Sequence, residues 1–138
     1  MSFLLARHGA VADVRLRAAL AAIGYSPRQG ITLVRLAEHG RLSQQALGEM
    51  LAVDPSVLVG ILNDLEVAEL VERRRDPADR RRHIVAITPK GEDALADVQT
   101  VLAGVERDLF ADLDATELAQ LRSLLARVRT RPDEPPCA

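Results

Sequence analysis

The chain has 138 residues, of which 48% are hydrophobic and 28% charged, and its net charge is −2. This length suits one domain with a substantial core, and the composition excludes a disordered protein and favours a mainly helical one. The single cysteine, Cys137, excludes an intrachain disulfide and a cysteine-based metal cluster within one chain, as expected for a reducing cytoplasm. No stretch approaches the roughly 20 apolar residues of a membrane span. We therefore expect a cytoplasmic protein that does not associate with membranes.

Helical periodicity, capping residues and helix stops predict four helices in the first half of the chain. They cover residues 3–23, the segment from Pro27 to the stop at Gly40, residues 44–51, and a segment that starts at Asp54-Pro55 and runs through Leu65. The fourth helix has an apolar stripe that we expect to be buried, formed by Leu58, Ile61, Leu62 and Leu65. Because the third and fourth helices are short and joined by a tight turn, they predict a helix-turn-helix.

Two short β-forming runs follow, residues 71–75 and 83–88, on either side of a turn-rich tip. They predict a hairpin that forms a wing after the helix-turn-helix. Thr88-Pro89 starts a long fifth helix, and Asp114 with Glu117 forms a capping pair for a sixth. The Pro-rich residues 131–138 predict a flexible tail.

This order of elements predicts a mainly α fold with a small β-hairpin wing: a winged helix-turn-helix that dimerises through its terminal helices. We expect a single domain over residues 1–138, with the winged-helix lobe at 26–88. Residues 1–23 and 89–130 would supply the dimerisation helices, because their apolar stripes exceed what a small core needs. The alternative is that these helices fold back on their own domain.

Six short motifs resemble the MarR family of multiple antibiotic resistance regulators. They are Leu42-Ser43-Gln44-Gln45-Ala46-Leu47, Val53-Asp54-Pro55-Ser56, Leu65-Glu66, Leu70-Val71-Glu72-Arg73, Asp76-Pro77-Ala78-Asp79-Arg80-Arg81 and Ile87-Thr88-Pro89-Lys90-Gly91. The resemblance covers nearly the whole chain. It implies a homodimeric regulator of double-stranded DNA, usually a repressor of a palindromic operator, that is often released by a small aromatic or other anionic effector.

The fourth helix is the candidate for insertion into the major groove. Its candidate contacts, left outside the buried stripe, are Ser56, Val57, Val59, Gly60 and Asn63. Serine and asparagine can hydrogen-bond bases or phosphates, valine can contact thymine methyl groups, and Gly60 would permit close approach. The helix departs from the family pattern, which commonly has Thr and Arg here, so we expect weak phosphate anchoring from it. The alternative is that the two valines pack on the wing or on a partner.

The remaining DNA candidates flank this helix. Ser43, Gln44 and Gln45 begin the third helix and could contact phosphates. In the wing, the resemblance implies a minor-groove contact by an arginine at the tip, Arg80 or Arg81, and Asp79 could hold its guanidinium by an ion pair. Arg73 is a weaker candidate because alternate strand residues face opposite sides. The alternative is that the arginine-rich run is simply a solvated surface.

On the first helix, His8 and Arg15 interrupt an otherwise apolar stripe. One hypothesis is an effector site in which Arg15 holds a carboxylate and His8 a phenol or carboxylate oxygen. The alternative, which the sequence alone favours, is an intersubunit ion pair or an arginine whose head reaches solvent.

We expect no enzyme, no metal site and no cofactor. The three histidines fall on different elements without a second ligand at a recognisable spacing, and there is no glycine-rich phosphate loop. The serious alternative to a DNA-binding regulator is a winged-helix module that binds protein.

Overall fold

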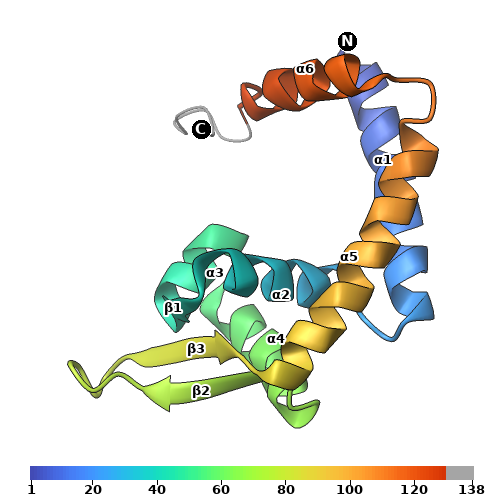
Figure 1. Ribbon diagram of the computed structural model, residues 1–138. Helices are drawn as coiled ribbons and strands as arrows, with labels where there is room; N and C mark the ends of the chain where they lie inside the picture. The colour runs from blue at the N-terminus through green and yellow to red at the C-terminus, as the bar shows by residue number, and fades with distance from the viewer. Residues whose placement is uncertain (130–138) are drawn as a thin grey trace. The chain divides into compact units, whose positions relative to one another are not determined.

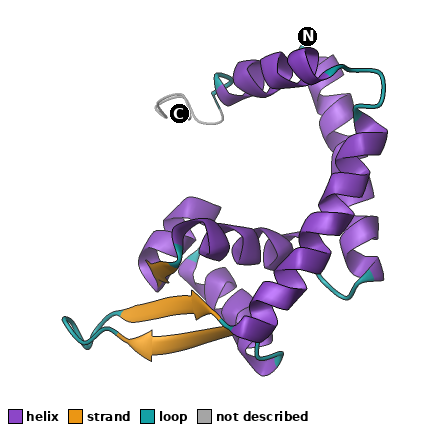
Figure 2. Cartoon of the chain, viewed as in Figure 1, coloured by secondary structure: helices purple, strands orange, loops and turns teal. Residues whose placement is uncertain are grey.

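The computed structural model describes residues 1–129, so the predicted tail at 131–138 and Cys137 lie outside the described residues. In chain order the elements are α1 (Ser2–Ala22), α2 (Pro27–His39), β1 (Arg41–Ser43), α3 (Gln44–Leu51), α4 (Pro55–Val67), β2 (Val71–Arg75), β3 (His83–Ile87), α5 (Pro89–Leu109) and α6 (Ala115–Ala126) (Figures 1 and 2). The predicted helices and wing strands are all present, and each helix starts within one residue of the predicted position.

The chain divides into two units, Met1–Val105 and Glu106–Ala138, with the boundary inside α5. The first unit holds the hydrophobic core. All four residues of the predicted α4 stripe are buried, and they pack with Leu33 and Leu36 of α2, Leu47 of α3 and Val85 of β3. This core also includes Leu20 of α1 and Val98 of α5, so it extends beyond the winged-helix lobe predicted at 26–88. In the second unit, no residue of α6 is buried.

Capping explains where several helices begin. Ser26 and Gln29 form a reciprocal capping box at α2, and Asp114 and Glu117 form another at α6, as predicted for the latter pair. Asp54 precedes α4 as predicted, but its carboxylate makes no capping hydrogen bond. Pro55, at the first position of α4, has no N–H to satisfy and a fixed φ that suits the first turn, and so favours a helix start at this point.

The wing belongs to a three-stranded antiparallel sheet in the order β1-β3-β2. Strand β1 was not predicted, because three residues are too few to reveal a two-residue period. The register places Leu42 and Arg73 on either side of the buried Val85, so these three side chains share the core-facing side of the sheet. Arg74, next along β2, lies on the opposite face, as predicted.

Among the described residues, no single helix is long and apolar enough to cross a membrane. Only α3 and α4 taken together pass the test of length and composition, and the pair is bent by 109° at the break between them. These are the two helices of the helix-turn-helix.

Candidate nucleic-acid interface

The face of α4 opposite its buried stripe carries most of the predicted DNA contacts. Ser56, Gly60 and Asn63 are exposed, and Val59 is 38% exposed. Val57 is different, because it is half-buried and packs against the core. The available face of α4 is therefore short, uncharged at these positions and open at Gly60, where an added Cβ would meet no atom within 4 Å.

The start of α3 supplies three polar side chains that differ in their burial and in their hydrogen bonds. Ser43 Oγ accepts the N–H of Ala46 at 3.1 Å and so caps the helix. Gln45 is exposed, and its Nε2 donates to Glu49 at 3.2 Å. Gln44 is half-buried, and its Oε1 is buried without a hydrogen-bond partner among residues 1–129. Of these three side chains, that of Gln45 is the exposed one and is therefore the most accessible to a ligand.

The wing tip is held by backbone hydrogen bonds, while its arginine side chains form no ion pair with any residue in the described part of the chain. The N–H of Asp76 donates to the carbonyl of Arg82 at 2.9 Å, which closes the hairpin. Asp79 was expected to pair with a neighbouring guanidinium, and this is wrong: its Oδ1 accepts the backbone N–H of Arg81 at 3.0 Å. An aspartate two residues before an N–H is well placed for such a turn, and among residues 1–129 its carboxylate forms no ion pair with an arginine.

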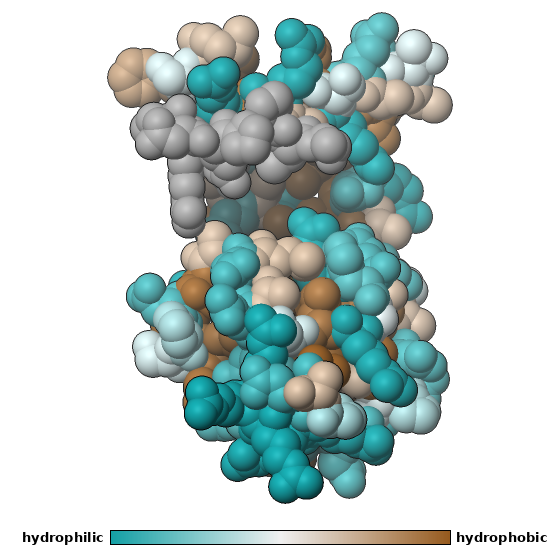
Figure 3. Space-filling view, turned by 90° about the vertical axis from the view of Figure 1, so that its left-hand side faces the viewer, coloured by the Kyte–Doolittle hydropathy of each residue, from teal (hydrophilic) through white to brown (hydrophobic). Residues whose placement is uncertain are grey.

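Arg80 and Arg81 are both exposed, and neither guanidinium forms an ion pair within the described part of the chain. Figure 3 looks onto the wing and shows hydrophilic side chains gathered over the lower part of that view. From Glu72 to Arg82 the chain has six arginines and three acidic residues. The wing is therefore a locally positive projection on a protein of slightly negative net charge.

Arg73 points toward α4 and forms a network that sequence reasoning did not predict. Its Nε donates to Glu66 Oε2 at 2.9 Å, its backbone N–H donates to Glu66 Oε1 at 3.1 Å, and its Nη2 donates to Asn63 Oδ1 at 2.6 Å. A second bond joins Nη2 to Glu66 Oε2. Arg73 is therefore engaged inside the protein and ties the wing to α4, in contrast to the free arginines of the tip.

The same network sets the ionisation of Glu66. The hydrogen bond from Arg73 holds the pKa of Glu66 below its usual range, and the positive charge of Arg73 acts in the same direction. Partial burial opposes this effect but does not outweigh it. Glu66 is thus a stable anionic anchor for Arg73 at neutral pH.

The predicted effector residues, His8 and Arg15, are both exposed on α1, and so are Leu4 and Val11, which lie on the same stripe of the helix.

A groove of about 410 Å³ lies elsewhere, on the outer face of the sheet. Its lining includes the apolar residues Ile84 and Ala86, the arginines Arg41, Arg74 and Arg75, and the acidic Glu72. Within residues 1–129, no cluster of His, Cys, Asp or Glu side chains could hold a metal ion.

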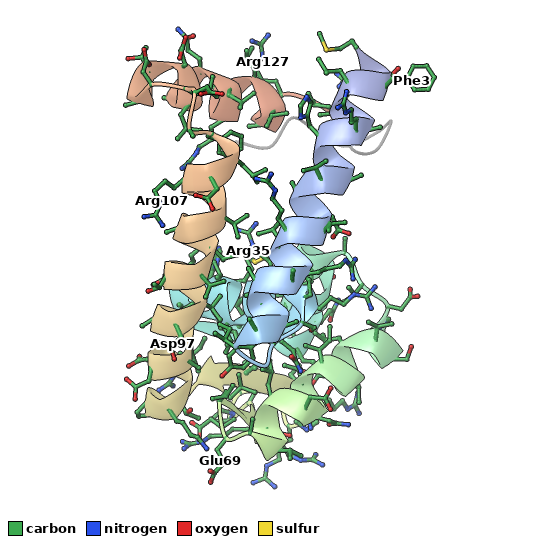
Figure 4. All side chains as sticks on the ribbon, turned by 90° about the vertical axis from the view of Figure 1, so that its right-hand side faces the viewer. Phe3, Arg35, Glu69, Asp97, Arg107 and Arg127 are labelled. Atoms are coloured by element: carbon green, nitrogen blue, oxygen red, sulfur yellow. The ribbon has the colours of Figure 1, made fainter. Side chains whose placement is uncertain are left out.

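The junction between wing and α5 explains the motif Thr88-Pro89-Lys90-Gly91. Thr88 Oγ1 donates to the carbonyl of Glu69 at 2.6 Å and accepts the N–H of Gly91 at 3.0 Å. Glu69, labelled in Figure 4 at the turn after α4, has a left-handed φ of 62°. Lys90 donates to its carboxylate at 3.0 Å. This junction fixes the direction in which the chain leaves the sheet.

Comparison with known proteins agrees with this architecture. The sequence pattern of the MarR family matches residues 25–83. A curated relative, the HTH-type transcriptional repressor NicR of Pseudomonas putida, is 37% identical over 101 residues, which cover 72% of this chain and 63% of the relative. The chain spans 61% and 63% of the length of two curated relatives that it matches.

Solved structures show the same fold over nearly the whole chain. A probable transcriptional regulator from Pseudomonas aeruginosa is 31% identical with a TM-score of 0.80, covering 92% of this chain and 95% of that one. A MarR-family regulator from Rhodococcus sp. RHA1 is 29% identical with a TM-score of 0.82, covering 90% and 88%. The chain belongs to the MarR family, and its fold is a winged helix. The predicted resemblance is thus confirmed, and the family is one of transcriptional regulators rather than enzymes.

Proposed function

We propose that this protein is a cytoplasmic transcriptional repressor that binds a palindromic DNA operator as a homodimer and is released by a small anionic effector. The observation that carries the proposal is the pairing, within one unit, of an exposed α4 face with a wing whose tip arginines have no partner inside the described chain. A helix of this kind fits the major groove, and exposed arginines suit the negative potential of the adjacent minor groove.

The apolar surface of α1 supports a dimer. Phe3 is 91% exposed and points away from the helix (Figure 4), and Val14 is 65% exposed. In α6, Leu124 is 57% exposed. Large apolar side chains on terminal helices need a cover, and a second copy of the chain would supply it. A two-fold dimer would bind an inverted repeat with half-sites about one helical turn apart.

The repressor role rests on the name of NicR, a relative called a transcriptional repressor. For the effector, we propose an aromatic carboxylate held by Arg15 and His8, because an arginine binds a carboxylate well and the neighbouring Leu4 and Val11 offer apolar contact. For operator contacts we propose the residues predicted from the sequence, with Arg73 acting through Asn63 rather than touching DNA itself.

A protein-binding winged helix is the second candidate, favoured by Val59 and by Val67, which is 87% exposed at the end of α4. Selection of bound duplexes from a random pool separates the two. An inverted repeat recovered by the wild-type protein, together with a dimer mass by light scattering at micromolar concentration, supports the proposal. Recovery of unrelated sequences only, or a monomer mass, contradicts it and favours the protein-binding alternative.

A further inference from the structure

Within residues 1–129, Asn63 is the one side chain on the exposed face of α4 that hydrogen-bonds to another side chain. A guanidinium has five N–H donors and no acceptor. The amide atom that faces Arg73 Nη2 at 2.6 Å must therefore be the oxygen, whichever way an unassigned amide could otherwise be turned. The amide nitrogen of Asn63, with two N–H donors, is left for the solvent side of α4.

Arg73 is itself immobilised. Glu66 accepts from both its side chain and its backbone, and the Arg73 and Glu66 side chains are only 21% and 32% exposed. Turning the Asn63 carbonyl outward would break its charge-assisted hydrogen bond to Arg73. The guanidinium of Arg73 is held in place by Glu66, so it could not move with the carbonyl. Asn63 is therefore prepared as a donor before any DNA arrives.

This matters because bases differ in what they present in the major groove. Guanine presents two acceptors, N7 and O6, whereas adenine pairs an acceptor at N7 with a donor at N6. The usual bidentate contact of asparagine with adenine needs the amide oxygen as acceptor. An amide oxygen has two lone pairs, but that of Asn63 is turned toward Arg73 on β2, so the side chain offers its N–H donors to a base; this suits guanine and loses the second bond to adenine.

We propose that Arg73, anchored by Glu66, makes Asn63 a donor-only side chain, so that the operator base pair facing Asn63 has guanine rather than adenine. This inference rests on the proposed function, since it requires α4 to lie in the major groove. It assigns Arg73 a positioning role in specificity rather than a contact with DNA.

The experiment starts from the selected operator and measures the affinity of all four base pairs at each half-site position. Wild type should prefer guanine over adenine roughly tenfold at one position, and Asn63→Ala should remove the preference there alone. Replacing that guanine by 7-deazaguanine should weaken wild type and leave Asn63→Ala unaffected, because it removes the N7 acceptor.

Two further variants test the positioning role. Arg73→Met should bring the guanine-to-adenine ratio close to one, whereas Arg74→Met, which removes a neighbouring charge on the opposite sheet face, should leave the ratio unchanged. Asn63→Asp keeps the acceptor for Arg73 but removes the donors, so it should lose guanine and prefer cytosine, whose N4 amino group donates. If Arg73→Met fails to fold, the base preference of Asn63→Asp still tests the inference, and a variant without a cytosine preference would contradict it.

The outcomes separate the two claims. No sequence preference in the wild-type protein contradicts the proposed function. A clear preference that is insensitive to Asn63→Ala, an adenine at the Asn63 position, or an unchanged ratio in a folded Arg73→Met dimer overturns the donor-only inference and leaves the proposed function in place.

Discussion

Gly91, in the first turn of α5, lies directly against the carbonyl oxygen of Leu70, at the start of the wing. A Cβ at position 91 would come within 2.0 Å of that oxygen and within 2.7 Å of an Ile87 side-chain carbon. The oxygen cannot retreat easily, because it also accepts the N–H of Thr88 at 3.0 Å. The junction between wing and α5 therefore depends on a residue without a side chain.

Gly91→Ala should lower the free energy of unfolding by about 2 to 3 kcal/mol, because backbone must shift to relieve the overlap. Denaturant unfolding followed by circular dichroism measures this change. Lys90→Ala is the matched control, one residue away and solvent-exposed, and should change the stability by less than about 0.5 kcal/mol. Equal effects of the two substitutions would mean that the close contact is not a constraint.

Gly60→Ala should stabilise the protein and weaken operator binding at the same time. A glycine in an exposed helix interior costs about 0.5 to 1 kcal/mol relative to alanine, and no atom within 4 Å opposes the new methyl group. On DNA, however, that methyl group would occupy the space that α4 needs for close approach. Gly9→Ala, an equally open site on α1, should stabilise similarly without changing affinity. A Gly60→Ala protein that binds the operator as wild type does would place Gly60 away from the DNA.

The Glu66 to Arg73 network should make stability depend on pH in a defined direction. Because Arg73 lowers the pKa of Glu66 in the folded protein, the network stabilises above the unfolded-state pKa of about 4.3, and this contribution is lost as the pH falls through the folded value. Glu66→Gln should therefore cost about 1 kcal/mol at pH 7 and much less near pH 3.

Glu38→Gln is the control for this measurement. It removes an exposed ion pair on the surface of α2, in which Arg35 Nη1 lies 3.0 Å from Glu38 Oε2. It should cost less than about 0.5 kcal/mol at pH 7. A Glu66→Gln penalty that is the same at both pH values would show that the anionic carboxylate is not what stabilises the contact.

Effector binding can be located with two arginine variants. A panel of benzoate-like acids, titrated by calorimetry, should include a compound that binds and lowers operator affinity. Arg15→Ala should abolish the heat of effector binding and keep operator binding. Arg41→Ala, which alters the groove on the outer face of the sheet, should keep both effector binding and operator binding. If Arg41→Ala instead removes the response, the effector site lies on the sheet; no heat with any acid leaves Arg15 as a structural residue.

Local signals predicted most of the fold. The starts of α2 and α6 follow from Ser26 and Asp114, because a capping residue acts on N–H groups only three positions away. The buried stripe of α4 could also be predicted, because its apolar residues recur at the spacing of a helix. The sequence could not reveal β1, because its three residues matter only through their pairing with β3.

The candidate site was predicted less completely. The exposed residues of α4 and the wing tip could be named from period and position, yet the role of Arg73 could not. Residues 63, 66 and 73 meet only after α4 and β2 pack together, so no spacing in the sequence indicates their contact. The left-handed conformation of Glu69 was missed for a different reason: glycine is the residue expected at a turn with a positive φ.

Salt dependence of DNA affinity tests the central claim, that the wing arginines and α4 bind duplex DNA, most directly. Wild-type protein, titrated by fluorescence polarisation with the selected duplex and with an unrelated one, should lose affinity steeply as salt rises, because bound arginines release counterions. The double variant Arg80→Ala/Arg81→Ala should weaken binding to both duplexes and reduce the slope of log affinity against log salt by about 2, while Arg28→Ala, an exposed arginine on α2, should leave the slope unchanged. An affinity independent of salt, or a double variant with the wild-type slope, would contradict the account.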